Sequence, residues 1–226
     1  MAAIAQGRFI TFEGLDGCGK STQLEKLAAH LRERKLDVVS TREPGGTAFG
    51  DRIRAILLDS RTAGLDTHTE LALMFASRAQ HIHEVILPAM RAGKIVLCDR
   101  FTDSSEAYQG GGRELGSEPV LALHRVLCGG LQPDLTILMD SDVASSVARA
   151  RRRNQAQAEE QQKTTDEGRF ERENQGFFER VHRAYHEIAR REPKRVALID
   201  ARRSIEVVHG EIVNVVQKRL SLPARP

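Results

Sequence analysis

The feature that most constrains the fold is residues 14–23, GLDGCGKSTQ, a glycine-rich segment between an apolar run and a helical pattern. The run before it, RFITFE at Arg8–Glu13, is short and partly β-branched, which is typical of a buried strand. After it, residues 22–34 repeat leucine and alanine at helical spacing. This order places backbone N–H groups and the positive end of a helix dipole around one concavity. The segment is therefore expected to bind an anion, whereas a flexible turn is the alternative.

Four residues of this segment, Gly14, Gly19, Lys20 and Ser21, fit the pattern G-x-x-x-x-G-K-[ST]. In such loops the backbone amides cradle phosphates, the lysine lies over the β and γ phosphates, and the hydroxyl is a ligand for Mg²⁺. The strand and helix patterns on either side are the structural context that this motif requires. We therefore predict a loop that binds nucleotide phosphates.

The length of 226 residues predicts a single domain over residues 1–226 with a full hydrophobic core. The 34 basic and 31 acidic residues, with a formal net charge of +3, are not a nucleic-acid-binding composition. The first ten residues lack the pattern of a leader, and no apolar run is long enough to span a membrane. Three scattered cysteines, Cys18, Cys98 and Cys128, argue against disulfides and structural zinc. We therefore expect a soluble, cytoplasmic protein with no membrane or nucleic-acid partner.

Apolar runs suited to buried parallel strands alternate with helical patterns along the chain. The runs are residues 8–13, 38–41, 95–99, 135–140 and 196–200. The helical patterns include residues 69–90, a segment that starts near Pro119, and two apolar stripes at residues 177–188 and 205–216. This order predicts an α/β fold with a five-stranded parallel sheet and helices on both faces.

One segment, residues 154–168, interrupts this pattern, because it has almost no apolar residues and follows the basic run RARRR at residues 149–153. The strand and helix patterns of the same sheet resume after it, so we expect a solvated loop or mobile flap and not a domain linker. We hypothesise that the segment is mobile without nucleotide. Equal protection from hydrogen exchange with and without an ATP analogue would contradict that hypothesis.

Polar residues follow three of the predicted strands. The glycine-rich loop follows the first, TREPGGT at residues 41–47 follows the second, and CDRFTDSSEAYQGGGR at residues 98–113 spans the end of the third. Ligands of open α/β sheets bind at the carboxyl ends of the strands, so these segments are expected to share one site. Each segment alone is also compatible with a turn and a helix cap.

Four motifs, FEGLDGCGKSTQ, REPGG, FASRAQH and DRFTDSSEAYQGGG, occur in this order and with these separations. Together they resemble the thymidylate kinase family, and the resemblance covers about residues 7–220. It implies a P-loop NTPase-type fold with a mobile lid at about residues 149–171 and an ATP- and Mg²⁺-dependent conversion of dTMP to dTDP. It also implies a homodimer. The physical requirements of phosphoryl transfer, which are positioning and positive charge, agree with these motifs.

The resemblance implies that the glycine-rich loop binds ATP, with Ser21 and Asp99 serving Mg²⁺, and that Asp16 lies near the sugar hydroxyl of the acceptor. A loop-shaping role remains the alternative for Asp16, and a structural ion pair remains the alternative for Asp99 with Arg100. Cys18 is expected to fill space, and a redox-sensitive thiol is the less favoured interpretation. The ATP-binding residues implied are Gly14, Leu15, Asp16, Gly17, Cys18, Gly19, Lys20, Ser21 and Thr22.

The resemblance also implies an acceptor site in which Phe75 stacks on thymine, Arg78 bonds its O4 edge and Arg100 clamps the acceptor phosphate. Phe75 and Arg78 lie three residues apart and so share a helical face, although a core position is the alternative for Phe75. Tyr108 is placed near C2′, where it would exclude a ribose hydroxyl. The remaining acceptor residues implied are Arg42, Pro44, Ser104, Ser105 and Gln109, and helix capping is the alternative for the two serines.

The variable positions of the glycine-rich loop, residues 15–18, carry no basic side chain, so the transition-state cation must come from elsewhere. In family members of this kind lid arginines have that role, and the resemblance transfers it to Arg149 and Arg151 first and then Arg153. A solvated charged face is the alternative. Unlike the family pattern, Gly168 stands where an aspartate is expected, after a long polar insert. The catalytic residues implied are Lys20, Asp16, Asp99, Arg100, Arg149, Arg151 and Arg153.

Two other functions remain open from the sequence. A kinase for another nucleotide would differ in the acceptor residues, chiefly Phe75, Arg78, Tyr108 and Gln109. A P-loop switch or nucleic-acid-binding ATPase would use the basic run on phosphate backbones and would bind DNA in a salt-dependent way. The aromatic content of 4% offers few platforms for base stacking, which argues against the second.

Overall fold

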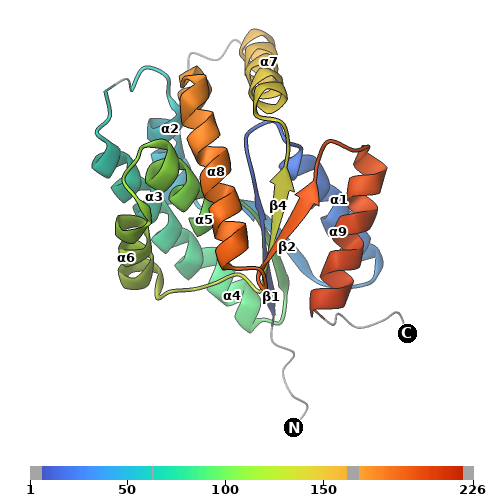
Figure 1. The fold of residues 1–226 in the computed structure, drawn as a ribbon. Coiled ribbons are helices and arrows are strands. Elements are labelled where there is room, and N and C mark those ends of the chain that lie inside the picture. The colour runs from blue at the N-terminus through green and yellow to red at the C-terminus, as the bar shows by residue number, and fades with distance from the viewer. Residues whose placement is uncertain (1–6, 63, 162–167, 221–226) are drawn as a thin grey trace.

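The computed structural model describes residues 7–62, 64–161 and 168–220, and it confirms the predicted α/β fold (Figure 1). The strands pair in parallel in the order β2-β3-β1-β4-β5, so β1 lies at the centre of the sheet. All five predicted runs form strands, namely β1 (Arg8–Glu13), β2 (Val38–Arg42), β3 (Ile95–Asp99), β4 (Leu135–Asp140) and β5 (Val196–Asp200).

Helices cover both faces of the sheet, as Figure 1 shows. On one face α1 (Lys20–Glu33) and α9 (Ile205–Leu220) pack their buried leucine, isoleucine and valine side chains on Ile10, Ile137 and Ile199. On the other face, Phe9 and Val96 contact the opposite set of helices, because successive side chains of a strand point to opposite sides. That set comprises α2 (Ala48–Leu58), α3 (Thr67–His81), α4 (Leu87–Arg91), α5 (Thr102–Ser105), α6 (Ser117–Cys128) and α8 (Gln175–Arg191).

The predicted helix at residues 69–90 extends from α3 through the π-helical segment η1 (Ile82–Ile86) to α4. The backbone stays helical at Ile82 and Leu87, so the three elements form one continuous helix. A second π-helical segment, η2 (Glu106–Gly112), follows α5, and a short 3₁₀ helix, η3 (Phe170–Arg172), precedes α8. π-helical turns, which are wider than α-helical turns, frequently occur at functional sites.

Two elements differ from the sequence-based expectations. Helix α2 was not predicted; it begins after Thr47, whose hydroxyl accepts a hydrogen bond from the Gly50 amide at 2.9 Å. The segment 154–168 is not entirely a loop or flap, because residues 154–161 continue the helix α7 (Val143–Gln161). Alanine, glutamine and glutamate are good helix formers, so a polar stretch without apolar residues can extend a helix. Residues 162–167 of that segment lie outside the described part of the chain.

The carboxyl ends of the five strands meet at one edge of the sheet, where Glu13, Asp99 and Asp140 are the last residues of β1, β3 and β4. Helix α7, coloured yellow in Figure 1, extends beyond this edge. None of the helices in the described residues is both long and apolar enough to cross a membrane. The edge, where a central strand meets neighbours on both sides, is the expected place for a ligand.

Candidate active site

A cleft of about 790 Å³ opens at the carboxyl edge of the sheet. Its walls come from the glycine-rich loop, the segment after β2, the helix α3, the segment after β3, and α7 with η3. Predicted site residues that line it are Asp16, Gly17, Gly19, Lys20, Ser21, Thr22, Arg42, Pro44, Arg78, Asp99, Arg100, Ser104, Ser105, Tyr108, Gln109, Arg149 and Arg153. Segments separated by more than 100 residues in the sequence therefore form one concave surface.

The glycine-rich loop holds the Lys20 ammonium over its own backbone. Lys20 Nζ donates to the carbonyl oxygens of Gly14 at 3.0 Å and Leu15 at 2.8 Å, and the side chain is buried. Gly14 has φ +130°, a conformation that a side chain would strain. Since Lys20 is the first residue of α1, the ammonium, the loop amides and the helix dipole act on the same place.

Ser21 and Asp99, the two residues expected to serve Mg²⁺, contact each other across the cleft. Ser21 Oγ donates to Asp99 Oδ2 at 2.8 Å. The other carboxylate oxygen, Asp99 Oδ1, is buried and has no hydrogen-bond partner among the residues that the structure describes. A buried oxygen without a donor is costly, so this atom has capacity for a ligand or a ligand's water.

Arg100 adopts a left-handed backbone conformation with φ +73°, which is strained for a residue with a side chain. Its guanidinium donates to the hydroxyls of Ser104 at 2.9 Å, Tyr185 at 3.1 Å and Tyr108 at 3.1 Å. It also forms an ion pair with Asp16 at 2.9 Å. Arg100 therefore joins the glycine-rich loop to the opposite wall of the cleft.

The Asp16 carboxyl is ionised at this position. Burial alone would raise its pKa, but the guanidinium of Arg100 and the ammonium of Lys20 outweigh burial and hold the pKa well below its ordinary value. Tyr108 adds a hydrogen bond from its hydroxyl to Asp16 Oδ2 at 3.2 Å. An ionised carboxylate accepts strong hydrogen bonds, so Asp16 is suited to hold a hydroxyl group of a ligand.

Arg78 extends from α3 toward the same cleft and is held by buried partners. Its Nε donates to Glu43 Oε2 at 2.6 Å, and its Nη2 donates to the Phe101 carbonyl at 3.1 Å and to Ser105 Oγ at 3.0 Å. His81 Nδ1 lies 2.9 Å from the other oxygen of Glu43. The remaining nitrogen, Arg78 Nη1, is buried and has no acceptor among the described residues. One donor of a fixed guanidinium is therefore left for a ligand.

The segment after Arg100 presents Ser104, Ser105, Tyr108 and Gln109 to the cleft. The capping alternative for the two serines is wrong, because α5 has Phe101 at its N-cap and no side-chain cap bond. Gln109 Nε2 donates to Glu70 at 2.8 Å, which fixes the orientation of the amide.

The structure does not bring Phe75 into the cleft. Phe75 is fully buried in the core beside Phe9 and Phe101, with the Arg78 guanidinium 4.7 Å from the centre of its ring. Met74, one residue earlier and four residues before Arg78, lines the cleft instead. The core alternative is therefore the one that fits the position of Phe75. A spacing of four residues would also have placed Met74 on the face of Arg78.

Helix α7 divides the three predicted lid arginines. Arg149 and Arg153, one turn apart, line the cleft, and Arg149 Nε donates to the Gly17 carbonyl at 2.8 Å. Arg151 is turned away from the cleft lining, and its Nε donates to the Glu171 carbonyl at 2.8 Å. A Cβ at Gly17 would lie 2.3 Å from the Ser146 carbonyl, so α7 packs directly on the glycine-rich loop.

Several residues of the cleft were not predicted. Their signals were weak, because an isolated leucine, asparagine or glutamate in a sequence does not reveal that it faces a ligand. The unpredicted lining residues are Glu43, Arg54, Leu58, Met74, Asn154, Phe170 and Glu171.

One of these residues, Glu171, has a perturbed carboxyl group. Burial raises the pKa of Glu171, and the carboxylate of Asp16 raises it further.

Beneath the cleft, Glu13 at the end of β1 is fully buried. It accepts hydrogen bonds from the Phe101 amide at 2.7 Å and from Ser104 and Tyr185. Burial, and then the negative charge of Asp103, raise the pKa of Glu13 to about 7, against the lowering effect of the Ser104 hydrogen bond.

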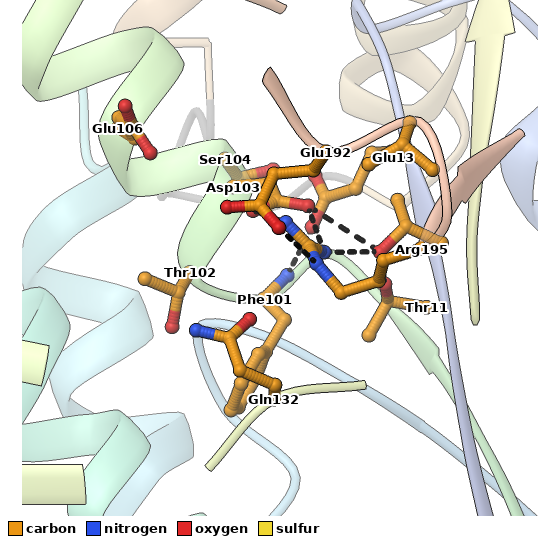
Figure 2. Close-up of polar contacts among 12 residues, drawn as sticks. Thr11, Glu13, Phe101, Thr102, Asp103, Ser104, Glu106, Gln132, Glu192 and Arg195 are labelled. Carbon is orange, nitrogen blue, oxygen red and sulfur yellow. Dashed lines mark hydrogen bonds and ion pairs between the residues drawn. The ribbon is translucent and has the colours of Figure 1, made fainter. Parts of the chain in front are cut away.

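Figure 2 shows this region, with Arg195 between the carboxylates and Thr11. Arg195 forms two hydrogen bonds with Asp103, at 2.7 and 3.0 Å, and bonds Thr136 Oγ1 at 2.8 Å. The Oγ1 atoms of Thr136 and Thr11 are hydrogen-bonded at 2.8 Å, so the network connects β1, β4 and the segment after β3. Arg195 thus neutralises Asp103, whereas Glu13 forms no ion pair among the described residues and is affected by the positive charge of Arg100 only as a minor lowering of its pKa.

We predict that Glu13 makes the free energy of unfolding depend on pH. Its pKa rises from 4.5 to about 7 on folding, so the folded chain retains a proton that the unfolded chain loses above pH 4.5. The stabilisation is complete below pH 4.5 and decreases by about 1.4 kcal/mol per pH unit until pH 7. Glu13→Gln should remove this slope. Urea unfolding between pH 4.5 and 8 measures it, with the exposed Glu25→Gln as the control. Parallel pH profiles of Glu13→Gln and the unmodified chain would contradict the prediction.

Comparison with known proteins identifies the family. The sequence model named "Thymidylate kinase" matches residues 12–212. A thymidylate kinase of Desulfovibrio desulfuricans is 50% identical over 193 residues, which cover 85% of this chain and 87% of that protein. A thymidylate kinase of Pseudomonas putida is 48% identical over 206 residues, which cover 91% of this chain and 93% of that protein. The crystal structure of thymidylate kinase from Ehrlichia chaffeensis superposes with a TM-score of 0.73 at 33% identity, covering 93% of this chain and 98% of that one.

These similarities extend over almost the whole sheet and cleft. The parallel sheet with surrounding helices matches the P-loop NTPase fold of the Ehrlichia enzyme. The matched residues 12–212 include the glycine-rich loop, Arg78, Arg100 and helix α7. The chain therefore belongs to the thymidylate kinase family and is a kinase.

Proposed function

We propose that this protein transfers the γ-phosphoryl group of ATP to dTMP, giving dTDP and ADP, in the synthesis of dTTP. The observation that carries the proposal is one continuous cleft with the glycine-rich loop at Lys20 and Ser21 and with Arg78 Nη1, which has no acceptor within the described part of the chain. Arg100 contacts both walls. Membership of the thymidylate kinase family and the names of the relatives support this choice of reaction.

The donor half of the cleft supplies positive charge and positioning. In the proposed reaction Lys20 and the loop amides bind the β and γ phosphates of ATP. Arg149 and Arg153, which face the loop from α7, stabilise the charge on the moving phosphoryl group. Phosphoryl transfer needs little covalent help from the protein, so such fixed cations are the main catalytic contribution.

The acceptor half recognises the phosphate, sugar and base of dTMP. Arg100 holds the acceptor phosphate, and the ionised Asp16 accepts a hydrogen bond from the sugar hydroxyl. Arg78 Nη1 donates to the O4 oxygen of thymine, and Met74 supplies an apolar contact from the same helix. Tyr108 lies beside Arg100 and Asp16, in accord with a role in excluding ribose. Buried polar groups that stay unpaired with the wrong base give strong discrimination.

Mg²⁺ fits the residues at the junction of the two halves. Ser21 and Asp99 present oxygen atoms, which Mg²⁺ prefers, and Asp99 Oδ1 has no other partner among the described residues. We propose that Ser21 holds the ion directly and that Asp99 holds its water shell. The ion would neutralise charge on the β and γ phosphate oxygens.

Asp99→Asn is predicted to raise the Mg²⁺ concentration for half-maximal activity by about tenfold or more, as expected for loss of a carboxylate that orients metal-bound groups. The amide can still contact Ser21, so the fold should be retained. The measurement is the initial rate against Mg²⁺ at fixed ATP and dTMP. The exposed Asp37→Asn is the matched control. An unchanged Mg²⁺ dependence in Asp99→Asn would exclude this role.

Three further properties are proposed on the same basis. A segment at about residues 149–171, of which residues 162–167 lie outside the described part of the chain, acts as a lid over ATP within a single kinase domain. This role is supported by the cleft position of Arg149, Arg153 and Glu171. The protein forms a homodimer, which is supported by the exposed apolar Val126 and Leu127 on α6. It acts in the cytoplasm, and its three free, buried cysteines suit a reducing compartment.

ADP formation from Mg·ATP tests the proposed reaction. The acceptors dTMP, dUMP, dCMP, UMP and AMP are assayed in parallel with a control that has no acceptor. We expect strong turnover with dTMP, weaker turnover with dUMP and none with the others. Turnover without acceptor, or only with a different base, would overturn the assignment of the acceptor site. The assignment of the glycine-rich loop as the ATP-binding site would remain.

A further inference from the structure

Outside the cleft, three metal-ligating side chains converge on one point. Asp140 is the last residue of β4, and His182 and His186 lie four residues apart on one face of α8. His182 Nε2 lies 2.9 Å and His186 Nε2 lies 3.0 Å from the same oxygen, Asp140 Oδ1. The two Nε2 atoms are 3.2 Å apart. None of these residues lines the cleft of the proposed kinase reaction.

Hydrogen bonding does not fully account for this arrangement. A neutral imidazole carries one N–H and one lone pair. If both Nε2 atoms carry hydrogen, both N–H groups converge on the one oxygen Asp140 Oδ1 and their hydrogens are crowded together, because the two nitrogens are 3.2 Å apart. If one or both Nε2 atoms lack hydrogen, at least one nitrogen lone pair faces the carboxylate oxygen. A cation between the three atoms removes both conflicts, because it accepts a lone pair from each.

The spacing of the three atoms matches a transition-metal site. With metal–ligand distances of about 2.1 Å, neighbouring ligand atoms lie about 3.0 Å apart at 90° and about 3.4 Å apart at the tetrahedral angle. The observed separations are 2.9, 3.0 and 3.2 Å. The ligand atoms therefore need almost no movement to hold an ion of this size.

The charge around Asp140 supports the same assignment. The carboxylate beside Asp140 on the adjacent strand, Asp200, is paired with Arg202 at 2.7 Å. In the described residues, the ion pairs of Asp140 are with the two histidines alone. The three side chains are 24–35% exposed, so an ion can enter from solvent.

We propose that Asp140, His182 and His186 form a binding site for a divalent transition metal ion such as Zn²⁺, with the remaining positions filled by water. Two imidazoles and one carboxylate favour Zn²⁺, Co²⁺ or Ni²⁺ over Mg²⁺, which prefers oxygen ligands. The ion joins α8 to the end of β4, three residues before α7 begins. Its role is structural, and the site does not depend on the proposed phosphoryl transfer.

A second cluster of potential ligands, Glu43, His81 and Cys98, carries no such inference. Both oxygens of Glu43 are engaged, by Arg78 at 2.6 Å and His81 at 2.9 Å, and His81 Nε2 contacts Thr41 at 2.7 Å. The cluster is buried and is a satisfied hydrogen-bond network. This cluster also serves as a comparison for the test. If Zn²⁺ bound there, its affinity would not change in the variants of α8.

The test uses the full chain, without a polyhistidine tag and without nucleotide, after treatment with a chelator. Zn²⁺ is titrated against a competing indicator dye, and the melting temperature is measured with and without Zn²⁺. Visible absorption of bound Co²⁺ gives an independent view of the ligands. The variants are His182→Ala, His186→Ala and Asp140→Asn, and the control is His83→Ala, which removes an exposed histidine elsewhere.

We expect one Zn²⁺ per chain and a higher melting temperature with Zn²⁺ in the unmodified protein and in His83→Ala. Each of the other variants should bind Zn²⁺ at least about tenfold more weakly, because loss of even an outer partner of a ligand costs 10- to 100-fold. Their melting temperatures without metal show whether they are folded. Zn²⁺ affinity that is undetectable in the unmodified chain, or unchanged in His182→Ala and His186→Ala, would overturn the proposal.

Discussion

Arg149→Ala is expected to lower kcat for dTMP phosphorylation by roughly 10³-fold, the lower end of the contribution of an arginine that contacts the transferring phosphoryl group. Arg149 lines the cleft and donates to the Gly17 carbonyl, so its guanidinium lies beside the loop that binds ATP. The loop itself supplies no arginine. KM for dTMP should change little, because the charge that Arg149 stabilises develops mainly in the transition state.

The register of α7 provides the controls for this prediction. Arg153, one turn further, lines the cleft, and Arg153→Ala should also reduce kcat. Arg151 bonds the Glu171 carbonyl, so Arg151→Ala should affect the order of the lid more than the chemical step. Arg152 is exposed, and Arg152→Ala should retain nearly full activity. Steady-state kinetics of the four variants show which arginines of α7 contribute to kcat. Equal losses in Arg149→Ala and Arg152→Ala would show that only the overall charge of α7 matters.

Lys20→Met is expected to lower kcat/KM for Mg·ATP by roughly 10²- to 10³-fold, the usual effect of removing one preorganised charge from such a site. Methionine has a similar length and apolar stem but cannot donate to phosphate oxygens. The lost hydrogen bonds to Gly14 and Leu15 are to carbonyls within the same loop, so the overall fold should persist.

Measurement of nucleotide binding separates this effect from unfolding. Lys20→Met should weaken binding of an ATP analogue, while its melting temperature without ligand should stay near that of the unmodified chain. Lys218→Met removes an exposed lysine of α9 and serves as the control. Unimpaired turnover in Lys20→Met would mean that the loop amides and arginines alone hold the phosphates, and the assignment of Lys20 would then be wrong.

The sheet was predictable chiefly because its three inner strands, β1, β3 and β4, are buried on both faces. Each of these strands then appears in the sequence as a short, nearly continuous apolar run, and the ends of β1, β3, β4 and β5 coincide with the ends of the predicted runs. Helix α7 was harder to predict, because residues 154–161 lack the apolar stripe that periodicity detects. Their helical conformation rests on intrinsic propensity and on continuation of the turn already formed at Arg149.

The site was predictable where a motif fixes the backbone, and less so where a side chain depends on tertiary packing. Lys20, Ser21 and Asp99 come together because strand ends meet at one edge. The choice between Met74 and Phe75 depends on which face of α3 meets the sheet, and adjacent residues of a helix point 100° apart. The partner of Arg78, Glu43, is 35 residues away, and no spacing rule reveals such a pair.

The contacts of Arg100 have a consequence for how substrate groups bind together. Its side chain is 14% exposed, and protein oxygens already surround the guanidinium, so most of the desolvation of this cation occurs when the chain folds. In the proposed reaction, a phosphate that binds Arg100 would therefore exchange one partner for another. It would compete with the carboxylate of Asp16 for the guanidinium, and Asp16 would then accept a hydrogen bond from the sugar hydroxyl in place of the ion pair. With these proposed roles, recognition of the phosphate and of the sugar would be thermodynamically coupled, and each event would increase the affinity for the other.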